Sequence, residues 1–174
     1  IAGCAEALAL FGPGTAEVVE AVNFNDPIQT VIAGTKAAVD KACEVLKAAG
    51  AKRALPLPVS APFHSSLMKP AAEKLRVALA DVALAAPQIP VVNNVDVAVQ
   101  QDADAIREAL YRQAFGPVRW VECVHALKGR GVTHIIECGP GKVLAGLTKR
   151  IDPELVGAAL FDPATLAETR ELLA

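Results

Sequence analysis

The sequence has 174 residues, of which 53% are apolar, and its 17 basic and 19 acidic side chains give a net charge of −2. This length and apolar share suffice to bury a core in one domain, or in one large and one small domain, so a soluble globular protein is expected. No apolar run approaches the roughly 20 residues that cross a bilayer, and the small net charge gives no field that would attract nucleic acid or anionic lipid.

The first 60 residues predict a small domain in which helices and strands are separated by turn residues. The expected order is helix, strand, strand, helix, strand, over residues 2–10, 18–24, 30–33, 35–50 and 55–59. This is the order of a split βαβ, ferredoxin-like unit without its first strand. Because a sheet that lacks a strand leaves backbone groups unpaired, we expect the missing strand to lie upstream of Ile1.

Two local features of this small domain lead to further expectations. Thr35 stands where its side chain could cap the second helix. Pro56 and Pro58 cannot donate to a strand ladder, so the strand over residues 55–59 is expected at the edge of a sheet.

From residue 61 onward, helices alternate with short apolar strands, which predicts a parallel or mixed sheet. The expected helices cover residues 67–82, 102–115, 118–128, 142–151 and 165–173. The expected strands cover residues 89–93, 134–138 and 155–161. The sequence therefore predicts an α/β fold in two domains, which comprise residues 1–60 and residues 61–174.

The residues that could carry out chemistry gather around His64. The chain has three serines, Ser60, Ser65 and Ser66, and none has the flanking glycines of the strained G-x-S-x-G turn that exposes a nucleophile. His64 follows a proline-rich segment at the start of a helix, where a fixed backbone would hold the ring as a general base. A histidine that only caps or packs at this turn is the alternative.

Other polar clusters do not match known sites. His125, His134, Glu137 and Cys138 fit no zinc-ligand spacing, so no metal site is expected. Gly139-Pro140-Gly141-Lys142 does not have the spacing of a phosphate-binding loop, and it is expected to form a tight turn between a strand and a helix. The chain has four widely spaced cysteines and no C-x-x-C pair, which predicts free thiols in a reducing cytosol.

Several short segments of the chain match a known protein family in their order and spacing. They are Asn23-Phe24-Asn25, Val31-Ile32-Ala33-Gly34, Pro56-Leu57-Pro58-Val59-Ser60 with Pro62 and His64, Leu67-Met68 with Pro70, and Glu137 with Gly139-Pro140-Gly141-Lys142-Val143-Leu144. Together they resemble the later half of the malonyl-CoA:acyl-carrier-protein transacylase family. The resemblance implies that residues 61–174 are the C-terminal part of an α/β-hydrolase-like acyltransferase domain, next to the incomplete ferredoxin-like small domain.

The resemblance also implies an activity. A serine would take malonyl from coenzyme A and pass it to the phosphopantetheine thiol of acyl carrier protein, in fatty acid biosynthesis. That serine would lie outside the 174 residues, which are expected to be inactive alone. The implied partners are malonyl-CoA and acyl carrier protein, with no nucleic acid, no membrane and no cofactor, since the coenzyme A thioester is the substrate. A monomeric cytoplasmic enzyme is expected.

The resemblance assigns His64 as the base and the backbone carbonyl of Gln113 as the group that orients it. Gln113 stands in a segment that reads as a helix end, where unpaired carbonyls are available. An ordinary helix terminus with no such role is the alternative.

The resemblance suggests substrate-binding roles for four further residues. Phe63 would crowd the space of an α-methyl branch and favour malonyl, or it simply packs in the core. Lys52 and Arg53 would meet the phosphates of coenzyme A or the acidic carrier protein, or they are a solvated pair. Asn25 would line the entrance to the site.

Two other interpretations stay open. The chain could be a non-catalytic carrier-protein-binding module, or an acyltransferase segment of a polyketide synthase. A G-H-S-x-G segment upstream of Ile1 would favour an enzyme over a binding module, and flanking synthase domains would favour the polyketide synthase.

Overall fold

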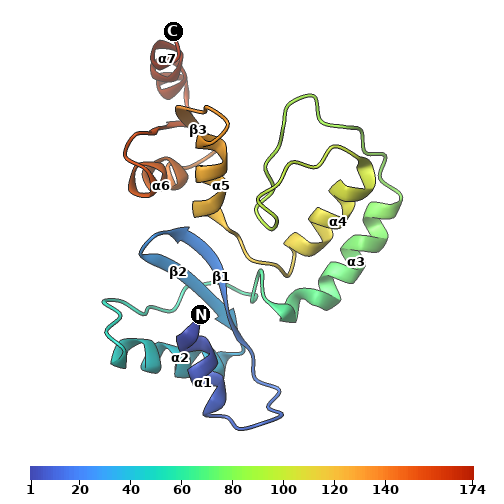
Figure 1. Ribbon diagram of the computed structural model, residues 1–174, viewed down its shortest axis with the longest axis vertical. Coiled ribbons are helices and arrows are strands. Elements are labelled where there is room, and N and C mark those ends of the chain that lie inside the picture. Colours follow the sequence, from blue (N-terminus) through green and yellow to red (C-terminus); the bar gives the residue numbers. More distant parts are fainter. The chain divides into compact units, whose positions relative to one another are not determined.

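The computed structural model describes all 174 residues and contains seven α-helices, one 3₁₀ helix and four strands (Figure 1). The α-helices are α1 Ala2–Ala9, α2 Lys36–Ala48, α3 Lys69–Ala80, α4 Ala103–Gln113, α5 Trp120–Lys128, α6 Val143–Ile151 and α7 Pro163–Leu172. The strands are β1 Val19–Asp26, β2 Gln29–Gly34, β3 His134–Cys138 and β4 Val156–Leu160, and the 3₁₀ helix η1 is Ser66–Met68. The α/β class expected from the sequence is confirmed, and each of the seven expected helices forms.

Two of the expected strands are wrong. Residues 55–59 form no strand, and Leu55 is 68% exposed. With no N–H on Pro56 or Pro58 the segment offers few ladder donors, and the Val59 N–H turns back to the carbonyl of Leu57 at 2.8 Å. Residues 89–93 make only one isolated antiparallel bridge, between Val92 and Val99.

The chain's internal contacts divide it into two compact units. One comprises residues 1–24 with 30–119, and the other comprises residues 25–29 with 120–174. This division follows contacts within the chain and differs from the domain boundary that the sequence predicts after residue 60, which stays a prediction.

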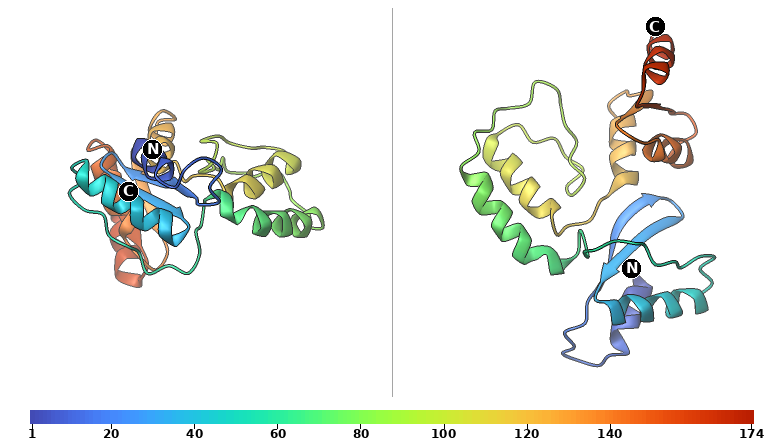
Figure 2. Two further views of the ribbon diagram at one scale, coloured as in Figure 1. Left: turned by 90° about the horizontal axis from the view of Figure 1, so that it is seen from below. Right: turned by 180° about the vertical axis from the view of Figure 1, so that it is seen from behind.

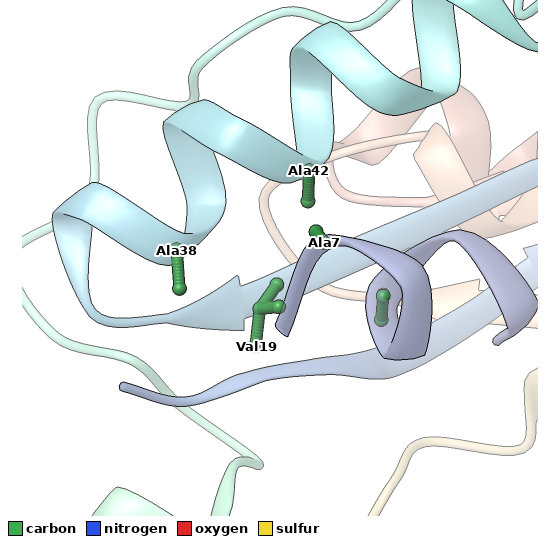
Figure 3. Close-up of a cluster of buried hydrophobic side chains, with 5 residues drawn as sticks. Ala7, Val19, Ala38 and Ala42 are labelled. Carbon is green, nitrogen blue, oxygen red and sulfur yellow. The ribbon is translucent and has the colours of Figure 1, made fainter. Parts of the chain in front are cut away.

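In the first unit, α1 and α2 pack side by side on one face of the β1–β2 hairpin (Figures 1 and 3). Their shared core consists of small and β-branched side chains, namely Cys4, Ala7, Val19, Ala38 and Ala42. Alanines at this interface let two helices approach the sheet closely, and burial of such apolar area stabilises the layer.

The start of β1 is tied to the end of β2 through Thr35. Its backbone N–H donates to the carbonyl of Val18 at 2.8 Å, and its hydroxyl hydrogen-bonds the carboxylate of Glu17. The expectation that the Thr35 side chain caps α2 is therefore wrong, although Thr35 does occupy the N-cap position. The hydroxyl instead hydrogen-bonds the carboxylate of Glu17, which precedes β1.

β1 pairs with β2 on one edge and with a single residue of a later segment on the other. Val118 donates its N–H to the carbonyl of Val22 at 2.8 Å and accepts the N–H of Phe24 at 2.9 Å. This parallel bridge joins the segment that follows α4 to β1. β1 therefore lies between β2 and Val118.

Helices α3 and α4 lie next to each other in both views of Figure 2. Arg107 of α4 crosses to the end of α3, where its guanidinium donates to the carbonyls of Leu79 and Val82 at 3.1 and 2.8 Å. The Leu79 carbonyl also accepts the N–H of Val82 at 3.2 Å, so Arg107 adds a side-chain donor there and holds α4 to the end of α3.

The second unit contains the parallel pair β3–β4 with α6 packed against it. Glu137 at the end of β3 accepts the N–H of Ala145 at 2.9 Å, and so caps the first turn of α6. Between them, Gly139 has φ +151 and donates its N–H to the carbonyl of Leu160 at 3.1 Å. The glycine-rich segment is thus a strand-to-helix turn.

No helix in the structure combines the length and the apolar character needed to cross a membrane.

The close approach of Gly34 to β1 generates a stability prediction. A Cβ at residue 34 would lie 1.9 Å from the carbonyl oxygen of Val18, so Gly34→Ala is expected to destabilise the fold by about 1–3 kcal/mol. Gly146 in α6 has open space around it, so Gly146→Ala is the matched control and should be neutral or stabilising by about 0.5–1 kcal/mol. Chemical denaturation measures both, and a Gly34→Ala variant as stable as the wild type would contradict the proposed close contact.

Candidate active site

His64 stands in a tight turn with a left-handed backbone, at φ 66. This conformation costs a non-glycine residue about 1–2 kcal/mol, although histidine tolerates it better than most. Ser65, fully buried, closes the turn: its N–H and its hydroxyl both donate to the carbonyl of Pro62, at 3.2 and 2.7 Å. Each such bond contributes about 0.5–1.5 kcal/mol, so together they offset the cost of the turn.

The turn is also anchored to β1. Ser66 is the first residue of η1, and its N–H is one of the helix-terminal donors that have no partner within the helix. The carboxylate of Glu20 accepts this N–H, with Oε2 at 2.8 Å. A side chain from a strand thereby caps the helix that begins two residues after His64.

The carbonyl of Gln113 is available for His64 because of the residue four positions later. Gln113 is the last residue of α4, and in a continuing helix its carbonyl would accept the N–H of residue 117. Residue 117 is a proline and has no N–H. The N–H groups of Phe115 and Gly116 bond instead to the carbonyl of Arg112, at 3.2 and 2.7 Å.

The ring of His64 forms a hydrogen bond with that free carbonyl. Its Nδ1 lies 2.9 Å from the Gln113 carbonyl oxygen. A carbonyl oxygen can only accept, so Nδ1 carries the hydrogen, and in the neutral ring Nε2 presents its lone pair. The ring is therefore held in the tautomer that a general base needs.

Aromatic and charged side chains hold the start of α3 next to the end of α4. Lys69 places its ammonium 5.7 Å from the centre of the Phe115 ring, and Tyr111 packs edge-on against the same ring at 5.1 Å. Because α3 begins at Lys69 and α4 ends at Gln113, the contact of Lys69 with Phe115 brings together the two ends that carry the site.

A hydrogen bond connects the exposed faces of the same helices. The hydroxyl of Tyr111 donates to Glu73 Oε1 at 2.6 Å, and the guanidinium of Arg76 donates to Oε2 of the same carboxylate. The Tyr111 bond, together with the Arg76 bond, lowers the pKa of Glu73, and the same bond raises the pKa of Tyr111. These groups are solvated, so their contribution is one of alignment rather than of large stabilisation.

The end of α4 has a second support in the loop that precedes the helix. Arg112 makes a bidentate pair with Asp96, with both N–O distances at 2.8 Å. Asp96 itself lies in a compact turn, where its N–H donates to the side-chain oxygen of Asn93 at 2.8 Å. The planar fork of the guanidinium fixes the direction of this contact as well as its strength.

The remaining residues predicted from the sequence lie at different places. Phe63 directly precedes His64. The phenylalanine is 52% exposed and does not belong to the hydrophobic core. Lys52 and Arg53 are exposed in the coil between α2 and the His64 turn. Asn25 is half-buried near the end of β1, in the unit that also holds α5, α6 and α7. The structure thus brings His64 into contact with Gln113, and Phe63 directly precedes His64 in the chain.

Known proteins share both the sequence and the fold of this chain. The malonyl CoA-acyl carrier protein transacylase of Salmonella typhimurium is 58% identical over 151 residues, which are 87% of this chain and 49% of that protein. The crystal structure of the acyl-carrier-protein S-malonyltransferase from Burkholderia pseudomallei 1710b is 67% identical with a TM-score of 0.92, over 98% of this chain and 53% of that one. The chain belongs to the malonyl CoA-acyl carrier protein transacylase family, in its C-terminal half.

A third relative was solved together with a carrier. It is a malonyl-transacylase in complex with its type II polyketide synthase acyl-carrier protein, 52% identical with a TM-score of 0.92, over 98% of this chain and 53% of that one. The chain spans about half the length of the transacylases that it matches. No protein-family model matches it.

Sequence reasoning missed two residues that shape this candidate site. Pro117 could have been found, because a proline four residues after a helix-terminal carbonyl leaves that carbonyl without its N–H partner. Glu20 had no such signal, since a single acidic residue in a strand of apolar neighbours gives no indication of a partner that lies 46 positions away.

The contact with Gln113 predicts the protonation pattern of His64. Long-range ¹H–¹⁵N NMR of the neutral ring should show the hydrogen on Nδ1 and none on Nε2. His125, exposed on α5, serves as an internal reference in the same spectrum. A His64 ring protonated on Nε2 would contradict the hydrogen bond to Gln113.

Proposed function

We propose that the complete protein containing this chain transfers malonyl from coenzyme A to the phosphopantetheine thiol of acyl carrier protein, through a malonyl-serine intermediate. Relatives that carry the name of this activity support the proposal. The single observation on which the mechanism depends is the 2.9 Å contact between His64 Nδ1 and the Gln113 carbonyl, because it leaves Nε2 as an acceptor.

In the first half of the reaction, His64 Nε2 accepts the proton of the serine hydroxyl as its oxygen attacks the thioester carbonyl. The tetrahedral intermediate collapses, the C–S bond breaks, and Nε2 returns the proton to the coenzyme A sulfur. The second half repeats these steps in reverse, with the phosphopantetheine thiol as the nucleophile. We place the serine in the part of the complete protein outside these 174 residues.

A backbone carbonyl suits this role of orientation. It is a fixed dipole without net charge, so it holds Nδ1–H in place at every pH at which the fold persists, whereas a carboxylate could itself titrate. The dipole also favours the imidazolium that forms when Nε2 accepts the proton. The thioester is already activated toward acyl transfer, so we propose no metal and no cofactor.

Position and chemistry support roles for the other predicted residues. Phe63, next to the base and exposed, would lie against the acyl group and disfavour an α-methyl branch. The exposed pair Lys52 and Arg53 would attract the phosphates of coenzyme A or acidic groups of the carrier protein. Asn25 would line the entrance to the complete site.

The acceptor has a second candidate. The relative solved with a type II polyketide synthase carrier favours that class of carrier as an alternative to the carrier of fatty acid biosynthesis. Turnover by the complete protein with each purified carrier distinguishes the acceptors, and binding without turnover would support a non-catalytic module.

We propose that the protein works as a monomer in the cytoplasm, which suits its four free cysteines.

The role of His64 can be tested with His64→Ala in the complete protein. Formation of the malonyl-enzyme is expected to fall by about 10²–10⁴-fold, because the serine loses its base. Rapid quenching followed by mass spectrometry measures the acylated fraction. His125→Ala, which changes an exposed histidine of α5, should acylate like the wild type. Wild-type acylation in the His64 variant would remove this residue from the mechanism.

The role of Phe63 in selectivity can be tested with Phe63→Ala. The ratio of kcat/KM for malonyl-CoA to that for methylmalonyl-CoA should fall about tenfold or more, since crowding of one methyl group is worth about 1–3 kcal/mol. The rate with malonyl-CoA serves as the internal control for the integrity of the site. An unchanged ratio would assign Phe63 no part in selectivity.

A further inference from the structure

The His64 turn has one support that the acyl-transfer chemistry does not itself use. Glu20 lies on β1 one residue after Val19, which faces the core formed with α1 and α2. Since side chains alternate along a strand, Glu20 points to the opposite face of the hairpin. Its Oε2 there accepts the N–H of Ser66 at 2.8 Å.

This contact acts on the backbone rather than on the ring. With His64 in its left-handed conformation, φ 66, the ring reaches Gln113 and the N–H of Ser66 reaches Glu20 on β1. If the carboxylate is lost, the N–H of Ser66 loses its partner, and a half-buried donor without a partner is unfavourable. The turn can then relax to a right-handed conformation, which would swing the ring away from the Gln113 carbonyl.

We propose that Glu20 is a positioning residue for His64: by capping η1 at Ser66, it holds the left-handed turn in which Nδ1–H reaches Gln113. This proposal rests on the proposed function for its effect on catalysis, but its geometric part concerns only residues of this chain. Glu20 contacts no reacting atom, so the effect belongs to kcat and not to substrate binding.

The test uses two substitutions of similar length in the complete protein. Glu20→Gln keeps an oxygen that can accept the Ser66 N–H, whereas Glu20→Met removes the acceptor. Glu20→Met is expected to lower kcat for malonyl transfer by about 10- to 100-fold with KM little changed, and Glu20→Gln should restore most of the rate. Glu44→Met, which removes an exposed carboxylate on α2 paired only with Lys41, is the control and should behave like the wild type.

A second readout follows the His64 ring directly. In Glu20→Met, long-range ¹H–¹⁵N NMR should show that the hydrogen no longer resides on Nδ1 alone, whereas Glu20→Gln should keep the wild-type pattern. Should Glu20→Met fail to fold, Glu20→Ala is measured in its place. A rate and an Nδ1–H signal that stay at the wild-type level in these variants would overturn the proposal, and so would a Gln variant as slow as the Met variant.

The failures of the two proposals can be told apart. If the complete wild-type protein forms no malonyl-enzyme, the proposed function fails. If His64→Ala acylates at the wild-type rate, the role of His64 as the base fails, whatever the Glu20 variants do. If His64→Ala is inactive and the Glu20→Met ring keeps its wild-type tautomer and rate, only the positioning role of Glu20 fails.

Discussion

The carbonyl of Gln113 is the group around which the site is built. It is free because the residue four positions after it, Pro117, has no N–H, and His64 Nδ1 lies 2.9 Å from its oxygen. One missing N–H in the backbone thus determines which nitrogen of an imidazole carries hydrogen. The cation–π contact of Lys69 and the Arg112–Asp96 pair both hold elements that meet at this carbonyl.

Local patterns of the sequence determine the helices and the hairpin of this chain. The periodic apolar faces of α2 and α4 and the turn after β1 are encoded within short windows, and each forms where the sequence predicts it. The strands expected over residues 55–59 and 89–93 failed for a different reason. Alternating or apolar residues permit a strand, but only a partner segment with free donors and acceptors makes one, and the window does not contain the partner.

For the candidate site, too, one part could be predicted from the sequence and another part could not. The resemblance to the transacylases pointed to His64 and Gln113 as partners, although 49 positions separate them. Neither the left-handed backbone of His64 nor the bond from Ser66 to Glu20 could be predicted, because both depend on where β1 lies in the folded unit. For Phe63, the sequence left packing and exposure open, and the structure shows an exposed ring.

β1 carries three of these relationships at once: Val19 in the helical core, Glu20 beneath the His64 turn, and the backbone bonds that bind Val118 after α4. Inserting or deleting one residue in this strand would exchange its two faces, so that the carboxylate would enter the core and a valine would face the turn. The strand therefore couples the packing of α1 and α2 to the placement of the imidazole. Substitutions on its two faces should show epistasis, even where the altered side chains never touch.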